Sequence, residues 1–123
     1  MYGMTPWVQR ILIANVAMFF VTASLPGLTR LLWFYPPTAF TQPWSVVTYM
    51  FLHGGFGHLF FNMLSLVIFG PRLEAKIGAN AFLRLYFLSG IGAALFQTLF
   101  ATAAPMVGAS GAVYAVLVGF AYY

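Results

Sequence analysis

The chain of 123 residues is 63% hydrophobic and 20% aromatic, and only 5% of its residues carry a formal charge. A typical soluble domain is about 45–50% apolar and about 25% charged, so this composition excludes an ordinary soluble fold. The net charge of +4 comes from five basic residues spread along the chain, a pattern that does not indicate a nucleic-acid-binding surface. The absence of cysteine excludes disulfides and thiolate metal sites. These numbers predict an all-α, multi-pass membrane protein.

Four apolar segments predict membrane helices, because about 20 mostly apolar residues are needed to cross the hydrocarbon core. The predicted helices cover about 8–28, 57–77, 80–103 and 110–123. No small-residue cleavage site follows the first segment, so we interpret it as a retained helix and not as a signal peptide. A bend is expected near Gly70-Pro71, and residues 1–123 are expected to form a single membrane domain.

Residues 30–52 mix aromatic side chains with prolines, which interrupt any long helix. The residues concerned are Trp33, Phe34, Tyr35, Pro36, Pro37, Phe40, Pro43 and Trp44. Because Trp and Tyr favour the headgroup level of a bilayer, this segment is predicted to be a structured interfacial loop.

Basic residues predict the orientation of the chain. Arg72, Lys76 and Arg84 flank the turn between the second and third helices, and short loops rich in Lys and Arg stay in the cytoplasm. The amino terminus is therefore expected to be cytoplasmic and the interfacial loop to lie outside, against the single opposing signal of Arg30. No organelle-targeting segment is evident, which favours a bacterial plasma membrane.

This topology predicts that polar residues from distant parts of the chain meet near the outer face. His58 and Asn62 lie four residues apart in the first turns of the second helix, so they share one of its faces. Ser110 begins the fourth helix at a similar depth, and Tyr114 follows it by one turn.

Ser110 has two interpretations within Gly108-Ala109-Ser110-Gly111. Serine is a preferred helix N-cap, which needs no further function. Alternatively, Ser110 is a nucleophile, since its glycine neighbours allow close backbone approach and the N–H groups of the helix start can hold an oxyanion.

His58 and Asn62 also have two interpretations, because polar residues within a membrane helix mark either function or interhelical hydrogen bonds. They either lock helix packing, or they donate to developing negative charge or serve as a base for Ser110. His53 adds a second imidazole five residues before His58. Two histidines and an asparagine are too few ligands for a metal site.

Glu74 is the only acidic residue. It follows His58 by 16 residues, about 24 Å along a helix, so it cannot orient that histidine. Its expected role is an ion pair with Arg72 or Lys76 at the cytoplasmic end of the second helix.

Small residues recur every four positions on the fourth helix, at Gly111, Ala115 and Gly119. Such a stripe allows close approach of another helix, so these residues are expected to contact helix-packing partners.

The ordered set of polar residues resembles that of the rhomboid intramembrane serine proteases. The matching segments read HGGFGHLFFN at 53–62, FGPRLE at 69–74 and GASG at 108–111. The resemblance extends over nearly the whole chain from the first predicted helix onward.

The resemblance implies a six-helix core, of which four transmembrane helices are present here. It implies that Ser110 is the nucleophile and that His58, Asn62 and the Ser110 backbone N–H form the oxyanion hole. Tyr114 corresponds to the tyrosine that stacks on the catalytic imidazole. The family cleaves transmembrane segments of other membrane proteins within the lipid bilayer, and it needs no metal or cofactor.

Two departures from the family pattern qualify the function that the resemblance implies. Trp44 is followed by Ser45, where the family often has Trp-Arg. The general base of the family is a histidine on the sixth helix, and this chain ends at Tyr123. We therefore expect a C-terminally truncated protease that is inactive alone. The alternatives are a non-catalytic rhomboid-like protein that binds membrane clients, and a small transport component.

Overall fold

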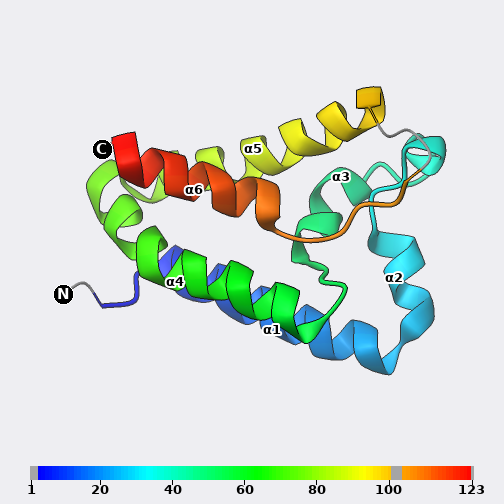
Figure 1. Ribbon diagram of the computed structural model, residues 1–123, viewed down its shortest axis with the longest axis horizontal. Helices are drawn as coiled ribbons and strands as arrows, with labels where there is room; N and C mark the ends of the chain where they lie inside the picture. The colour runs from blue at the N-terminus through cyan, green and yellow to red at the C-terminus, as the bar shows by residue number, and fades with distance from the viewer. Residues whose placement is uncertain (1–2, 101–103, 123) are drawn as a thin grey trace.

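The computed structural model describes residues 3–100 and 104–122, which form helices joined by short connections (Figure 1). In chain order the elements are α1 (Pro6–Ser24), α2 (Pro26–Leu32), the 3-10 turn η1 (Pro36–Thr38), α3 (Ser45–Thr48), the 3-10 turn η2 (Tyr49–Phe51), α4 (Phe56–Ile77), α5 (Ala79–Phe100) and α6 (Ser110–Tyr122).

Helices α1, α4 and α5 are each long and apolar enough to cross a membrane, with 19, 22 and 22 residues. Helix α6 is apolar but has only 13 residues. The chain is thus an integral, multi-pass helical membrane protein, which confirms the predicted fold class.

The first helix ends earlier than the sequence pattern predicted. Helix α1 stops at Ser24 instead of Leu28, and α2 starts at Pro26. A residue before proline is disfavoured in helical conformation, and Leu25 accordingly adopts φ −127° and ψ 78°. By contrast, α4 continues through Pro71 to Ile77. The predicted third helix extended to residue 103, and residues 101–103 lie outside the described part of the chain.

The interfacial loop at 30–52 consists largely of short helical turns anchored by side-chain hydrogen bonds. The Trp44 indole Nε1–H donates to the Leu31 carbonyl at 2.9 Å, and the Thr48 hydroxyl donates to the Leu32 carbonyl at 2.7 Å. The Tyr49 hydroxyl donates to the carbonyl of Gly90 on α5. The first two bonds hold α3 against α2, and the third joins the loop to α5.

Helix α6 packs against both α4 and α5, while α1 packs against α4 (Figure 1). A Cβ added to Gly111 would lie 2.9 Å from the Ala93 Cβ on α5, and one added to Gly119 would lie 3.0 Å from Leu73 on α4. Two members of the small-residue stripe therefore contact helices of the same chain.

Glu74 has a role that the sequence did not predict. Its side chain is 6% exposed and accepts hydrogen bonds from the backbone N–H groups of Trp7 and Val8, at 3.4 and 3.2 Å. These groups belong to the first turn of α1, where N–H groups have no acceptor within the helix and the helix dipole favours negative charge. The carboxylate thus joins the start of α1 to the end of α4.

The close approach of α6 and α5 predicts the effect of a methyl group at Gly111. Gly111→Ala is expected to lower the free energy of unfolding in detergent by about 1–3 kcal/mol, because its Cβ overpacks the contact with Ala93. Gly92→Ala is the matched control, since no atom lies within 4 Å of its added Cβ. Equal stability of the two variants would contradict the packing described here.

Candidate active site

Helices α4 and α6 bring His58, Asn62 and Ser110 together. The His58 Nε2 atom lies 3.1 Å from the Ser110 Oγ, and the Ser110 hydroxyl donates to the Asn62 Oδ1 at 3.3 Å. His58 and Ser110 are exposed, whereas Asn62 is 8% exposed. Three polar side chains from positions up to 52 residues apart therefore form one connected group.

The hydrogen bonds of Asn62 and Ser110 are compatible with a donor role for His58. The Asn62 Nδ2 donates to the His58 carbonyl at 2.9 Å, which leaves the Asn62 Oδ1 free to accept the serine proton. The serine hydroxyl has one proton, so when that proton is directed to Asn62 the bond between His58 Nε2 and Ser110 Oγ requires the His58 tautomer with Nε2 protonated. A group that donates to the serine oxygen is suited to stabilise negative charge there.

Ser110 is not the N-cap of α6, which was the simpler of its two interpretations. Helix α6 begins at Ser110, and the Ala109 carbonyl accepts the first bond, from the Val113 N–H at 2.8 Å. Ala109 therefore occupies the capping position, and the Ser110 hydroxyl contacts His58 and Asn62 instead. The backbone N–H of Ser110 belongs to the first turn, where the helix dipole is positive.

Gly108 controls how closely the segment before Ser110 approaches His58. Its φ is +110°, a conformation that residues with a Cβ rarely adopt. An added Cβ would lie 2.6 Å from the Cε1 atom of His58. The Gly108 N–H donates to the Tyr49 carbonyl at 2.9 Å, so the interfacial loop holds this segment in place.

A second anchor lies two residues earlier. Phe34 and Met106 form an isolated antiparallel bridge, with N–H to carbonyl distances of 3.0 and 2.7 Å. The aromatic-rich loop is thus joined at two points to the segment that leads into Ser110. The composition of this loop predicts its interfacial position but not its bonds to the segment before Ser110.

His53 lies beside His58 in a buried position. Its side chain is 7% exposed, and its ring centroid lies 5.1 Å from that of His58 in an edge-to-face arrangement with an interplanar angle of 71°. Burial, with a smaller contribution from His58, lowers the pKa of His53 from 6.5 to about 4. His53 is therefore neutral at physiological pH.

Tyr114 lies on α6 one turn after Ser110, and its side chain is 68% exposed. Its assignment as a ring that stacks on a catalytic imidazole stays a prediction.

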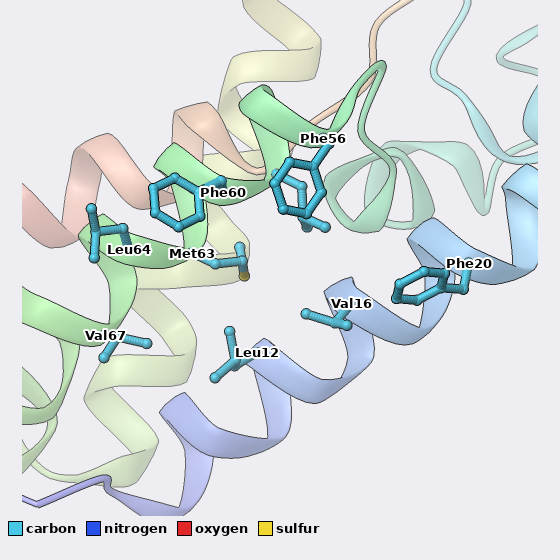
Figure 2. Close-up of a pocket in the computed structure, with 9 residues that line it drawn as sticks. Leu12, Val16, Phe20, Phe56, Phe60, Met63, Leu64 and Val67 are labelled. Atoms are coloured by element: carbon cyan, nitrogen blue, oxygen red, sulfur yellow. The ribbon is translucent and has the colours of Figure 1, made fainter.

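A separate apolar groove of about 400 Å³ lies between α1 and α4 (Figure 2). The groove is lined by Leu12, Val16, Phe20, Phe56, Leu59, Phe60, Met63, Leu64 and Val67. None of the three polar residues lines this groove, so it is distinct from the candidate site.

Comparison with known proteins agrees with the resemblance of the sequence to the rhomboid family. The family described as "Rhomboid domain" matches residues 41–123, which include every residue of the candidate site. RHOMBOID-like protein 1 of Arabidopsis thaliana is 43% identical over 76 residues, which cover 62% of this chain and 20% of that protein. The rhomboid protein YdcA of Bacillus subtilis (strain 168) is 35% identical over 86 residues, which cover 65% of this chain and 43% of YdcA. Inactive RHOMBOID-like protein 8 of Arabidopsis thaliana is 40% identical over 76 residues, which cover 62% of this chain and 21% of that protein. The chain thus spans less than half the length of these relatives.

The contact at Gly108 predicts that even a methyl group there disturbs the site. Gly108→Ala is expected to displace the His58 imidazole, because the new Cβ clashes with Cε1 and the positive φ becomes strained. Imidazole ¹⁵N NMR of the chain in lipid nanodiscs measures this as a shift of the His58 signals. Gly54→Ala, with no atom within 4 Å of its added Cβ, is the control. Unshifted His58 signals in a folded Gly108→Ala protein would refute the contact.

The burial of His53 predicts a pH dependence of stability. Its pKa is about 4 in the folded chain and about 6.5 when unfolded, so only the unfolded state takes up a proton between these values. Stability should therefore fall as the pH decreases from about 6.5 to about 4. Thermal unfolding in detergent at pH 7 and pH 5 measures the decrease, which should be smaller in His53→Phe. The same decrease in both proteins would show that His53 is not the group responsible.

Proposed function

Because the chain belongs to the rhomboid family, we propose that it acts in intramembrane serine proteolysis, with Ser110 as the nucleophile. The substrates proposed are transmembrane segments of other membrane proteins, and the bond cleaved is a peptide bond. The observation that carries the proposal is the hydrogen-bonded group of Ser110, His58 and Asn62 at the start of α6.

The chemistry follows from the donors around the serine oxygen. Attack of the Ser110 Oγ on the scissile carbonyl transfers negative charge to the carbonyl oxygen. The donors proposed to stabilise this oxyanion are His58 Nε2–H, the Ser110 backbone N–H and the second Asn62 Nδ2–H, which is not the one bonded to the His58 carbonyl. Collapse of the tetrahedral intermediate releases the amine and leaves an acyl-enzyme, which water then hydrolyses.

The general base is proposed to be neither His58 nor His53. In the proposed tautomer His58 donates to the Ser110 Oγ, and His53 is buried beside it with no hydrogen-bond partner among the described residues. These are the two histidines in the sequence. The family resemblance assigns the base to a histidine of a sixth helix, and Tyr114 would stack on that ring.

The proposed orientation places this site near the outer face of the membrane. Arg72, Lys76 and Arg84 lie at the opposite end of α4 and around the turn into α5, and basic residues in short loops favour the cytoplasm. We propose a bacterial plasma membrane as the location, with the amino terminus in the cytoplasm.

A non-catalytic role in binding membrane clients is the second candidate. It is favoured by the 40% identity to Inactive RHOMBOID-like protein 8, which is close to the identity to the other relatives. Overall similarity therefore does not separate the two candidates, and the presence of Ser110 together with His58 and Asn62 supports the protease.

The test supplies the proposed base in a chimera. Residues 1–123 replace the amino-terminal part of an active rhomboid protease up to the end of the matched segment, so that the scaffold adds the helices with its catalytic histidine. In proteoliposomes with a single-helix membrane reporter, the chimera is expected to cleave the reporter. Ser110→Ala should abolish cleavage, and His58→Ala should lower its rate by about 10²–10³-fold, as expected for loss of an oxyanion donor.

Two outcomes would contradict the proposal. Ser110-dependent cleavage by the 123-residue chain without the scaffold helices would mean that His58 or His53 is the base. A chimera that is folded by circular dichroism but neither cleaves the reporter nor reacts with a fluorophosphonate probe would favour client binding. The unmodified scaffold protease is the positive control.

A further inference from the structure

The His58 ring is oriented by more than its own helix. Its side chain is exposed at the start of α4, and exposed side chains change rotamer within picoseconds to nanoseconds. The Nε2 atom nevertheless has to stay within 3.1 Å of the Ser110 Oγ for the proposed chemistry. Additional contacts must therefore restrict the ring.

Two neighbouring residues restrict the His58 imidazole. Gly108 lies against Cε1, the atom next to Nε2, so closely that no Cβ fits between them. The His53 ring contacts His58 edge-to-face at 5.1 Å. This distance and angle fall within the range that aromatic pairs prefer, so the contact favours one orientation of the His58 ring.

His53 acts through its ring and not through hydrogen bonds. Both of its ring nitrogens are buried, and neither has a hydrogen-bond partner among the described residues. A buried polar side chain without hydrogen-bond partners costs free energy. An apolar side chain would fill this position at lower cost, so the presence of histidine here calls for a reason other than packing. His53 follows a packed segment, in which Tyr49, Met50 and Leu52 are each 1% exposed.

We infer that His53 is a positioning residue, which holds the His58 imidazole so that its Nε2–H points at the Ser110 Oγ. The inference rests on the proposed function of this site, because it assigns His53 a purpose in orienting an oxyanion donor. His53 acts on His58 through the contact between the two rings. Another aromatic side chain at position 53 can make this contact, whereas an aliphatic or amide side chain cannot.

The test uses the fact that the sequence contains only two histidines, so that ¹⁵N-histidine NMR of the chain in lipid nanodiscs shows two imidazoles. The wild-type chain is expected to have a single His58 tautomer, with Nε2 protonated. His53→Ala and His53→Gln, which lack the ring, should give averaged His58 signals. His53→Phe should restore the single tautomer. In the chimera, the first two variants should lower kcat at least tenfold with KM unchanged.

Phe82→Ala is the matched control, because Phe82 is a fully buried ring on α5 outside the hydrogen-bonded group. It should lower the thermal stability without altering the His58 signals. Unaltered His58 signals in His53→Ala or His53→Gln, or averaged signals in a folded His53→Phe protein, would overturn the inference. If the signals respond as expected while the wild-type chimera is folded and inactive, the positioning contact is supported and the proposed protease function is contradicted.

Discussion

The contact between Gly108 and His58 is the constraint on which the candidate site depends. A backbone with φ +110° and no side chain allows the segment before α6 to pass directly against the imidazole. The same residue donates its N–H to the Tyr49 carbonyl, so the position of Ser110 is set by the interfacial loop as well as by α6. The loop is thereby a structural part of the site, although none of its own side chains joins the hydrogen-bonded group of Ser110, His58 and Asn62.

The fold brings polar groups together in a chain that has few of them. Small residues allow α6 to approach both α4 and α5, and this approach places the Ser110 hydroxyl within reach of side chains on α4. The hydroxyl, imidazole and amide hydrogen-bond to one another, so that Asn62, the buried member, avoids the cost of an unpaired polar side chain. Glu74 satisfies the backbone of α1 by the same principle at the other end of α4.

Much of this arrangement could be predicted from the sequence, because polar residues are rare in it. The scarcity identified His58, Asn62 and Ser110, and charge placement indicated that they lie at one end of the bundle. The early end of α1 was missed even though Pro26 is a local signal. The bonds from Glu74 to the backbone of α1 could not be predicted, because these partners lie up to 67 residues away and local charge patterns point only to Arg72 and Lys76. The bridge between Phe34 and Met106 joins two irregular segments. Such segments have no periodic sequence pattern from which the pairing could be predicted.

The most direct test of the central claim is a crystal structure of the chimera after Ser110 has reacted with a fluorophosphonate. The phosphoryl oxygen of the adduct stands for the oxyanion of the tetrahedral intermediate. The proposed roles predict that this oxygen lies about 2.7–3.1 Å from the His58 Nε2 and the Asn62 Nδ2. An adduct on Ser110 whose oxygen points away from both residues, or an adduct on a different side chain, would contradict the assignment of the nucleophile and its oxyanion hole.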